Sequence, residues 1–509
     1  MAAIDIGSSA IRMDIAEVKT DGTIRILDAL KKGVQLGREA FTDGHLSQDT
    51  IRAACDALRD FKRVMDGYGV TRYRAVATSA VRESSNSEMF LDRLLMSTGL
   101  DVEIIDGPEE NRLTLSVVMD LLRGETDLGK AKSLLVEMGG GSTDIAVFGD
   151  GELLQSSTLP LGSIRLRAGM STGPAKPEQQ ARLLKRQISG FLSNLKREME
   201  IRDAVRCIAL GGDVRLAARV LNIAPQNERL YLIPRDAFSD FVDGLSKLPI
   251  DGIVQKFSIN YLDAETLVPA LLTYLLLLKE TQAQDIIITD ANIRAGILQD
   301  LAPVEEGKRR KKLSSQILSA ARSLARKYHY DESHADRVRE LALHLFDELK
   351  VEQRMTESHR LYLEVAAVLH DIGAFVSPRS HHKHSHYLIS SSELFGLRKR
   401  ELDLIANIAR YHRRAMPQRS HAPFMALDRD DRMIVSKLAA ILRVANALDK
   451  DHLQKIPELK ISREGDQIVL TAPNVSDMTM GRLALASRSD FFTEVFGKKL
   501  ILREADKPV

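Results

Sequence analysis

The chain carries the same short pattern twice, and this repeat limits how the chain can fold more than any other feature. The first copy is Ile4–Ile6 followed by Gly7–Ser9, and the second, about 130 residues later, is Val136–Met138 followed by Gly139–Ser142. Each copy joins two runs of β-forming residues through a turn of small residues, and each first run contains an acid. This order predicts a β-hairpin. Two copies predict an internal duplication, with two similar half-domains around one cleft.

The turns at the tips of both predicted hairpins consist of Gly, Ser and Thr. Such a turn leaves backbone N–H groups uncovered, so an anion can approach them closely. Its hydroxyls stand beside acids, and oxygen atoms of this kind hold divalent cations. A single glycine-rich turn is usually only a tight turn. The pair, in matching strand contexts, favours a phosphate-binding cleft.

The segments between and after the two copies alternate between helix and strand patterns. Apolar residues from Ile51 to Met65 recur on one helical face, and Ser47 precedes them as a cap. A polar run, Ser84–Ser87, is placed to cap the next helix. Strands are predicted at Tyr73–Thr78, Val102–Ile105 and Cys207–Leu210. The order hairpin, helix, strand, helix occurs twice and predicts an α/β fold.

Six stretches in about the first 300 residues resemble the Ppx/GppA phosphatases, the exopolyphosphatases and guanosine pentaphosphate phosphohydrolases of the actin-like ATPase superfamily. In family order, the stretches are AIDIGSS, ATSAVRES, IIDGPEENRL, LLVEMGGGSTDIAVF, TLPLGSIRL and IALGGDVRLA. The resemblance implies two actin-like (ribonuclease H-like) domains, then an all-α HD-like domain and a small α+β domain. Their expected ranges are 1–124, 125–304, 313–456 and 457–509.

Length and composition agree with a multidomain globular protein of 509 residues, 44% hydrophobic and 28% charged. The N-terminus enters a strand at once, so we expect no signal peptide. The apolar run Leu267–Leu278 is too short to span a bilayer. Cys55 and Cys207 lie in apolar patterns typical of reduced core residues. The net charge of +2 argues against general nucleic-acid binding. We expect a cytoplasmic protein with no membrane or nucleic-acid partner, and the resemblance implies a homodimer.

The segment Glu305–Lys312, just after Pro303, is dense in charge and predicts a solvated linker and helix start. The pattern beyond it is almost entirely helical. Helices are predicted at His334–Leu349, His359–His370, Ser390–Leu397, Leu402–His412 and Met433–Leu448. After them, Leu459–Ile461, Gln467–Leu470 and Lys499–Leu502 are typical of strands, and Arg488–Phe496 of a helix.

The predicted helical region has its own candidate metal ligands. His334, His370, Asp371 and Asp449 resemble the H…HD…D ligand set of HD-domain phosphohydrolases. Imidazole and carboxylate groups from separate helices can hold one divalent metal and leave positions open for water. Long Ppx/GppA proteins carry an HD-like third domain whose ligands are often degraded, and here the set is intact.

Two nearby segments, His381–His386 and Arg410–Arg414, are rich in histidine and arginine. They suit an extension of the metal site, a basic groove for a phosphate chain, or simply a polar loop and a solvated helix end. Guanidinium groups bind phosphate oxygens in pairs and raise the local concentration of an anionic substrate. Of these alternatives we favour the groove.

The resemblance assigns roles to residues of the N-terminal half. Glu110 matches the catalytic glutamate, although an acid in the first turn of a helix is also common for purely electrostatic reasons. Asp5, Glu137 and Asp144 form the expected magnesium environment, directly or through water. Family members usually have Asp in place of Glu137 and Asn in place of Ser9, which leaves direct coordination by Glu137 open. The expected phosphate-binding residues are Ser8, Ser9, Arg82, Gly139, Gly140, Gly141, Ser142 and Thr143.

We therefore expect a magnesium-dependent exopolyphosphatase, which removes the terminal phosphate of inorganic polyphosphate with Glu110 as the general base. The same site suits the 5′-terminal phosphate of guanosine pentaphosphate, because both substrates present a terminal phosphoanhydride. A second alternative is an HD-domain nucleotide phosphohydrolase with its own divalent metal. A non-catalytic, actin-like nucleotide-binding regulator is the least favoured, because it leaves the Glu110 segment without a purpose.

Overall fold

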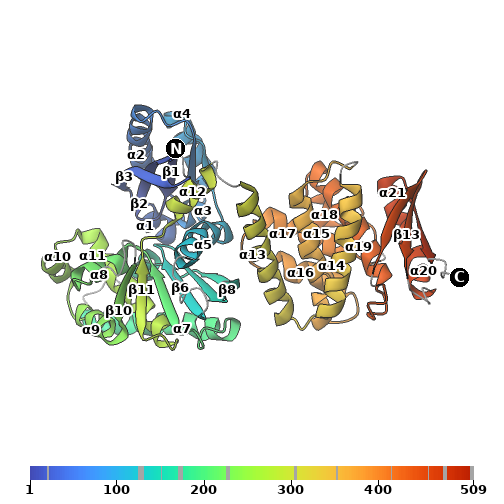
Figure 1. Cartoon of the computed structure of the whole chain (residues 1–509). Helices are drawn as coiled ribbons and strands as arrows, with labels where there is room; N and C mark the ends of the chain where they lie inside the picture. Colours follow the sequence, from blue (N-terminus) through green and yellow to red (C-terminus); the bar gives the residue numbers. More distant parts are fainter. Residues whose placement is uncertain are drawn as a thin grey trace. The chain divides into compact units, whose positions relative to one another are not determined.

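The computed structural model divides into two compact units, Met1–Arg309 and Arg310–Val509, which are described one at a time (Figure 1). The structure describes residues 1–19, 22–123, 131–150, 152–169, 176–224, 230–302, 306–350, 353–413, 415–456, 458–473 and 479–504. The predicted boundary at 124/125, together with Pro303, Glu305 and Arg414 of the charged segments, lies outside these ranges. The finer division into four domains stays a prediction.

The first sheet of the N-terminal unit contains the first predicted hairpin. Its strand order is β3-β2-β1-β4-β5, in which β1 pairs antiparallel with β2 and parallel with β4. The strands are β1 (Ala2–Ile6), β2 (Ala10–Val18), β3 (Ile24–Gly33), β4 (Tyr73–Ala77) and β5 (Val102–Ile104). In the hairpin, Asp5 lies opposite Arg12. The prediction of this hairpin is confirmed.

The second sheet contains the second hairpin and has the order β10-β11-β9-β6-β7-β8. Its strands are β6 (Ser133–Met138), β7 (Thr143–Gly149), β8 (Glu152–Leu159), β9 (Arg206–Leu210), β10 (Leu230–Pro234) and β11 (Asp285–Thr289). β6 pairs antiparallel with β7 and parallel with β9, which repeats the pairing of β1 in the first sheet. In this hairpin Glu137 lies opposite Asp144. The internal duplication predicted from the sequence is therefore present in the α/β fold.

Helices cover both sheets. They are α1 (Leu36–Thr42), α2 (Gln48–Gly67), α3 (Ser79–Arg82), α4 (Ser87–Thr98), α5 (Gly107–Arg123), α6 (Ser163–Ala168), α7 (Pro177–Glu198), α8 (Gly212–Val220), α9 (Arg235–Leu245), α10 (Ile250–Phe257), α11 (Tyr261–Lys279) and α12 (Ile293–Leu301). Ser47 caps α2 by accepting a hydrogen bond from the Thr50 N–H, as predicted. At α4 the cap residue is Asn86, but its side chain bonds the backbone of Leu46 instead of the helix. The expected side-chain cap is therefore absent there, because Asn86 joins two loops.

Helix α11 forms the centre of the second core. Among the described residues it is the one helix long and apolar enough to cross a bilayer, and 61% of its apolar window is buried. The hydroxyl of Tyr274 in α11 accepts a hydrogen bond from the Met138 N–H at 2.9 Å and donates one to the Leu210 carbonyl. These bonds tie α11 to the ends of β6 and β9, so the helix is a core element of the unit.

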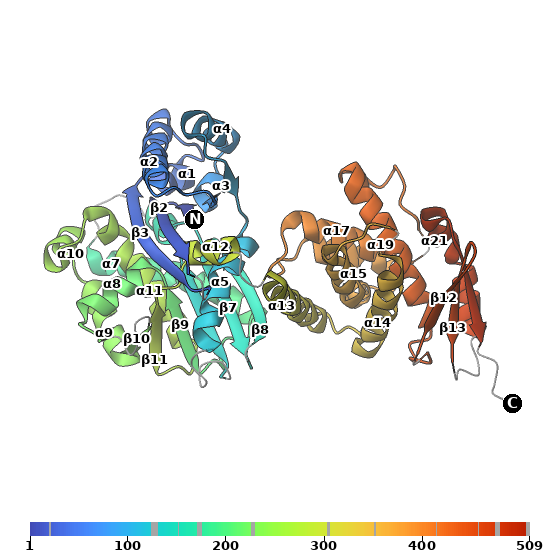
Figure 2. The same cartoon turned by 45° about the horizontal axis from the view of Figure 1, so that its top comes forward.

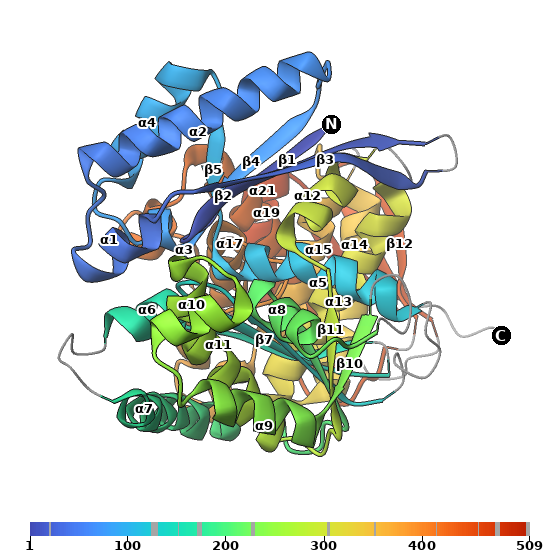
Figure 3. The same ribbon diagram turned by 90° about the vertical axis from the view of Figure 1, so that its left-hand side faces the viewer.

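Helix α12 falls within the range predicted for the second domain, yet it packs on the first sheet and on α5. Ile293, Ile297 and Leu298 share a buried cluster with Ala3, Val76 and Leu113. Figures 2 and 3 show α5 and α12 side by side between the strands of the two sheets. Gly296 makes this approach possible, because a Cβ atom there would lie 2.1 Å from the Leu113 carbonyl oxygen.

The second unit begins with helices and ends with a small sheet. Its elements are α13 (Glu306–Lys327), α14 (Glu332–Leu349), α15 (Glu357–Leu369), η1 (Ile372–Phe375), α16 (His381–Ser390), α17 (Lys399–Arg410), α18 (Ala422–Met425), α19 (Arg429–Leu448), β12 (Lys460–Glu464), β13 (Gln467–Ala472), α20 (Thr479–Ala486), α21 (Ser489–Phe496) and β14 (Lys499–Glu504). The predicted helix Ser390–Leu397 is wrong. α16 ends at Ser390, and turns follow, with the left-handed Gly396 (φ 75°) among them. The buried apolar residues of this segment are held in turns, which hydrophobic spacing alone does not distinguish from a helix.

We predict that Gly296→Ala separates α12 from α5. The added methyl group overlaps the Leu113 backbone, so the free energy of unfolding should fall by roughly 1–3 kcal/mol, and the positions of the α5 side chains should shift. Urea unfolding of the full chain measures this change. The matched control is Gly190→Ala in α7, where a Cβ atom meets nothing within 4 Å. That variant should gain about 0.5–1 kcal/mol from its lower backbone entropy. Equal stability of the two variants would contradict the packing argument.

Candidate functional site

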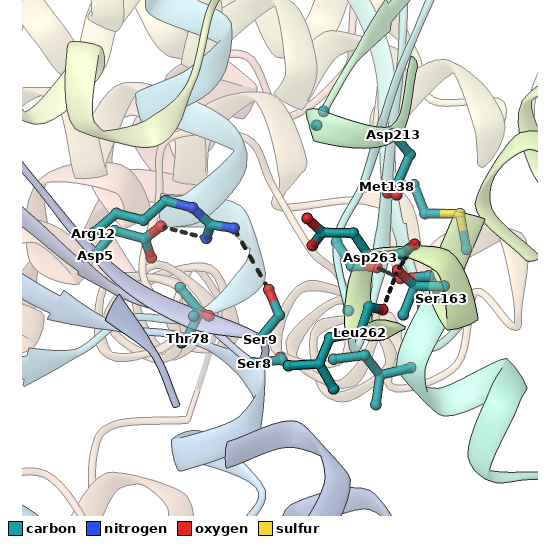
Figure 4. A pocket seen from close by; sticks show the side chains of 18 of the residues that line it. Asp5, Ser8, Ser9, Arg12, Thr78, Met138, Ser163, Asp213, Leu262 and Asp263 are labelled. Carbon is teal, nitrogen blue, oxygen red and sulfur yellow. Dashed lines mark hydrogen bonds and ion pairs between the residues drawn. The ribbon is translucent and has the colours of Figure 1, made fainter. Parts of the chain in front are cut away.

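The tips of the two hairpins meet at one cavity of about 970 Å³ within the N-terminal unit (Figure 4). Gly7, Ser8 and Ser9 line it from the first tip, and Gly139, Gly140 and Ser142 from the second. The tips are in close contact, because a Cβ atom on Gly140 would lie 2.8 Å from the Ser8 Cβ. The structure thus brings together the two tips that the repeat predicts to face each other.

Two carbonyl groups of the second tip are bonded to the backbone at the start of α6. The carbonyl of Gly139 accepts a hydrogen bond from the Ser163 N–H, and that of Gly140 accepts one from the Ile164 N–H, both at 3.0 Å. In a trans peptide the N–H points opposite to the C=O. The N–H groups of Gly140 and Gly141 therefore point away from α6. Uncovered N–H groups in succession form an anion-binding concavity.

The acids of the hairpins lie at or beside this cavity; Asp5 and Asp144 are buried and Glu137 is half-buried. Asp5 and Glu137 line it. Two guanidinium groups face Asp5: Arg12 Nη1 lies 3.8 Å and Arg294 Nη1 lies 3.7 Å from Asp5 Oδ2. Burial nevertheless raises the pKa of Asp5 against the opposing effect of both arginines. Burial and the neighbouring Asp144 raise the pKa of Glu137 to about 7.

Glu110 and its neighbour Glu109 occupy different environments in the first turn of α5. Glu109 accepts hydrogen bonds from Arg74 at 2.9 Å and from Arg112 at 2.7 and 3.0 Å. Burial raises its pKa, but those arginines outweigh burial and the pKa of Glu109 is lowered. Arg112 also forms an ion pair with Asp300 of α12. Glu109 therefore fastens α5 in place and is not available for chemistry.

Glu110 lines the cavity and has no such set of partners. Its buried Oε2 atom has no hydrogen-bond partner among the described residues, and the Arg82 guanidinium lies 3.6 Å away. Burial, with Asp144 as the next contribution, raises the pKa of Glu110 well above its usual value. A buried carboxylate oxygen that faces a cavity without a partner is suited to bind a water molecule or a proton.

The donor set of this cavity fits a hard divalent cation. Asp5 and Asp144 help to raise the pKa values of both Glu110 and Glu137, and Glu137 helps to raise that of Glu110, so these carboxyl groups lie close enough to repel one another. Asp144 is held by hydrogen bonds from Asn111 at 3.2 Å and Thr158 at 2.6 Å, so it is fixed in orientation. Carboxylate oxygens are the ligands that magnesium prefers. Asp5 and Glu137, which line the cavity with Glu110, could hold such an ion, and a role for Asp144 as a ligand stays a prediction.

Basic residues on the remaining walls form a set that the sequence did not single out. Figure 4 shows Arg12 reaching between Asp5 and Ser9, within 3.5 Å of the Ser9 hydroxyl. The other basic lining residues are Lys31, Arg38, Arg167, Arg215, Arg219 and Arg294. The sequence contains one indication that Arg215 lies near a ligand site. It follows Gly211, whose φ of 129° suits glycine alone, at the end of β9, where an open α/β sheet binds its ligand.

Four predicted residues are not among those that line the cavity. Arg82 donates a hydrogen bond to the Ile105 carbonyl at 2.5 Å and lies beside Glu110. The Thr143 hydroxyl donates a hydrogen bond to the Leu161 carbonyl, so this hydroxyl already has a partner within the fold. Gly141 packs against Phe41 and Ser79, and Asp144 is the residue held by Asn111 and Thr158. Their expected contacts with phosphate or metal stay predictions.

The helical unit contains a second cluster, which we call the histidine cluster, made of His334, His370, His381, His412 and Asp371. The Nε2 atoms of His334 and His370 lie 3.9 and 3.6 Å from Asp371 Oδ2. Those of His381 and His412 lie 3.1 and 3.2 Å from Asp371 Oδ1. The fourth expected ligand, Asp449, contacts His334 Nδ1 at 2.8 Å. For His381 and His412, this geometry favours the metal alternative over a basic groove.

Comparison with known proteins gives one consistent result. The profile described as the Ppx/GppA phosphatase family matches residues 15–305, and that described as Ppx/GppA phosphatase, domain III, matches residues 318–477. A guanosine-5′-triphosphate,3′-diphosphate pyrophosphatase of Aeromonas hydrophila is 23% identical over 93% of this chain and 92% of its own. The Aquifex aeolicus Ppx/GppA family member is 25% identical with a TM-score of 0.50, covering 59% of this chain and 96% of its own. An exopolyphosphatase from Cytophaga hutchinsonii is 24% identical with a TM-score of 0.54, covering 58% and 96%.

We predict that Glu137→Gln stabilises the protein at pH 8 in the absence of divalent cations. A carboxyl group whose pKa is raised to about 7 binds its proton more tightly in the folded state than in the unfolded state. Ionising it therefore destabilises the fold as the pH rises from about 4.5 through 7. In chelator at pH 8, Gln should raise the free energy of unfolding by up to about 3 kcal/mol, and at pH 5 it should change little. Thermal melts at both pH values measure this.

The matched control for this prediction is Glu198→Gln at the exposed end of α7, which should leave both melts unchanged. Magnesium provides a second readout. Added Mg²⁺ should raise the melting temperature of the wild type more than that of Glu137→Gln, because the variant has lost one ligand charge. A variant less stable than the wild type at pH 8 in chelator would show that Glu137 is compensated in the fold.

Proposed function

The chain belongs to the Ppx/GppA phosphatase family, and we propose that its N-terminal unit is an exopolyphosphatase that removes the terminal phosphate of inorganic polyphosphate. The observation that carries the proposal is the buried Oε2 of Glu110, which has no hydrogen-bond partner among the described residues, in the cavity lined by both hairpin tips. Hydrolysis of a phosphoanhydride requires a positioned water, a group that accepts its proton, and positive charge near the leaving group. Each of these has a candidate among the residues of the cavity.

In this proposal Glu110 accepts a proton from the attacking water. The water oxygen forms a bond to the terminal phosphorus, and the bond from that phosphorus to the bridging oxygen breaks. The shortened chain leaves with the bridging oxygen. The pKa of Glu110, raised by burial, makes its carboxylate a stronger base than an exposed glutamate. The pairing of Glu109 with Arg74 and Arg112 keeps the helix turn that carries Glu110 fixed during this step.

Charge around the phosphoryl group comes from three sources in this proposal. The tip N–H groups around Gly140 bind the terminal phosphate. Arg12 and Arg294, which face Asp5, lie close enough to the first tip to contact phosphate oxygens. A magnesium ion held by Asp5, Glu137 and Asp144 would supply further positive charge to the transferring group. The acids and the cation compensate one another, which explains why so many carboxyl groups are tolerated here.

The basic lining of the cavity supports a phosphate chain as the substrate. Its basic side chains extend along the walls, and no Phe, Tyr or Trp occurs among the described residues that line it. Guanidinium and ammonium groups suit a repeating anion. Ile164, Leu216, Ile259 and Leu262 also line the cavity and offer apolar faces of the kind that can hold a guanine base. Guanosine pentaphosphate is the alternative substrate, because it presents the same terminal bond. Action in the cytoplasm and as a homodimer stay predictions.

We predict that Glu110→Gln abolishes phosphate release. The substitution keeps the size of the side chain but removes the base, so kcat should fall by roughly 10²–10⁴ while polyphosphate binding persists. Phosphate release by wild type and variant is compared on long-chain polyphosphate and on guanosine pentaphosphate, using one preparation of each. The control is Glu88→Gln on the exposed face of α4. In the wild type, kcat should rise with pH through the raised pKa of Glu110. A kcat for Glu110→Gln within a few-fold of wild type would exclude Glu110 as the base.

The helical unit supplies a second candidate, a metal-dependent phosphohydrolase, because the histidine cluster is largely buried and complete. A double variant, His370→Ala with Asp371→Ala, separates the two candidates. If the cavity of the N-terminal unit performs the chemistry, this variant should hydrolyse polyphosphate within several-fold of wild type. If the histidine cluster performs it, loss of two ligands should remove the activity, and Glu110→Gln should remain active. Thermal melts establish first that the double variant is folded.

A further inference from the structure

Arg165 of α6 joins the second hairpin tip to the first half of the N-terminal unit. Its Nε atom donates a hydrogen bond to the Gly141 carbonyl at 2.8 Å. Its Nη2 atom donates to both carboxylate oxygens of Glu83, at 2.7 and 2.6 Å, and its guanidinium carbon lies 4.3 Å from the centre of the Phe41 ring. Charge-assisted hydrogen bonds and an aromatic face leave a guanidinium group little freedom to turn. Arg165 is therefore held in one orientation.

The Arg165 side chain does not belong to the basic wall of the cavity. Arg167, two residues later, lines the cavity, whereas Arg165 is not among the described residues that do. Its side chain is 29% exposed, in contact with the outside of the tip. A residue in this position can affect a bound phosphate only through a group that reaches the cavity.

The Gly141 carbonyl is such a group. The two preceding carbonyls of the tip, those of Gly139 and Gly140, accept hydrogen bonds from the backbone of α6. The carbonyl of Gly141 accepts its bond from the Arg165 side chain. Because the N–H of a trans peptide points opposite to the C=O, this bond sets the direction of the Ser142 N–H. Ser142 lines the cavity, so the third N–H of the tip depends on one side chain.

The tip needs this support because it consists of three successive glycines, Gly139–Gly141. Glycine has a wider choice of backbone conformation than any other residue. Close packing fixes where the tip lies. A Cβ atom on Gly162 would lie 2.2 Å from the Gly140 carbonyl oxygen, and one on Gly141 would lie 2.4 Å from the Phe41 ring. Packing does not fix the rotation of a peptide plane in place, whereas a hydrogen bond to its carbonyl does.

We infer that Arg165 is a positioning residue for phosphate binding. By holding the Gly141 carbonyl, it directs the Ser142 N–H toward the cavity, so that three successive N–H groups face one terminal phosphate instead of two. Consecutive N–H groups of this kind form an anion-binding concavity. Glu83 and Phe41 hold the guanidinium in place, so the first half of the unit supports the tip of the second. The inference rests on the proposed function in one respect, that the second tip binds phosphate.

The first test measures affinity without hydrolysis. Methylenediphosphonate, whose P–C–P link resists hydrolysis, is titrated calorimetrically into the full chain in magnesium. Arg165→Met keeps an unbranched side chain against Phe41 but donates no hydrogen bond, and the loss of one N–H bond to a charged group should weaken binding roughly tenfold. Glu83→Gln, which loosens the guanidinium but leaves its Nε donor, should weaken binding several-fold. The control Arg182→Met, on the exposed face of α7, should bind as the wild type does.

Kinetics on polyphosphate give a second readout. The N–H groups of the tip bind the phosphate before and during the reaction, and loss of such uniform binding raises KM without changing kcat. Arg165→Met should therefore raise KM by the same factor as it weakens phosphonate binding, with kcat within about twofold of wild type. A general structural defect lowers kcat or the amount of folded enzyme instead.

A spectroscopic measurement locates the effect. The serines that follow a glycine in this sequence are Ser8, Ser142 and Ser163. Cell-free synthesis with carbonyl-¹³C glycine and ¹⁵N serine thus gives three amide signals that are selected by their ¹³C–¹⁵N bond, assigned by replacing each serine with alanine. Phosphonate should shift the Ser142 signal in the wild type and shift it much less in saturated Arg165→Met. The Ser163 signal should stay in place, because its N–H bonds the Gly139 carbonyl in both proteins.

The outcomes separate this inference from the proposed function. Equal phosphonate affinity of wild type and Arg165→Met, an equal Ser142 shift, or a Ser163 signal displaced by the substitution alone would overturn the inference and leave the proposed function standing. Binding that depends on Arg165 in a protein that releases no phosphate would overturn the exopolyphosphatase proposal alone. A wild type that does not bind methylenediphosphonate would overturn both. Glu83→Gln decides the matter if Arg165→Met fails to fold, since unchanged affinity in that variant would contradict the role of Arg165.

Discussion

The burial of several like-charged carboxyl groups around one cavity is the constraint on which the N-terminal unit depends. Asp5, Glu137 and Asp144 come from the two hairpins and Glu110 from α5, so three separate elements must converge. An ionised carboxyl group in the interior is costly unless it is paired. The apolar cores beneath each hairpin supply the stability that holds these groups together. These carboxyl groups can therefore be buried together only where protons, basic side chains or a bound cation compensate their negative charge.

Helix α5 connects this group of acids to the first sheet and to α12. Glu109, the neighbour of Glu110, is paired with Arg74 of the first sheet, and Arg112 connects it to Asp300 of α12. Gly296 lets α12 approach the α5 backbone. Glu109 and Glu110, adjacent in one helical turn, thus have different structural roles. Glu109 is paired with two arginines and anchors the helix, whereas Glu110 lines the cavity with the Arg82 guanidinium 3.6 Å from its Oε2. The position of Glu110 therefore depends on contacts of α5 with the first sheet and α12, which lie away from the cavity.

The two sites of this chain are opposites in composition. The cavity gathers carboxyl groups around a space lined with basic residues, whereas the histidine cluster gathers four imidazoles around one carboxylate. Carboxylate oxygens suit magnesium, and imidazole nitrogens suit transition metals. The two donor sets therefore differ in the metal ions that they would favour.

Sequence patterns predicted what depends on neighbours along the chain. Both hairpins, the cap at Ser47 and the tips of the cleft were predictable because strand alternation and turn residues are local signals. The basic walls of the cavity were not, since Arg215 and Arg167 reach it through contacts between distant elements. The histidine cluster shows the same limit. A Cβ atom on Gly373 would lie 2.2 Å from the His381 carbonyl oxygen, and the Gly373 N–H donates to Ser385 at 2.9 Å. This close contact of η1 with α16 brings His381 near Asp371, and only the folded chain reveals that Gly373, eight residues before His381, allows the approach.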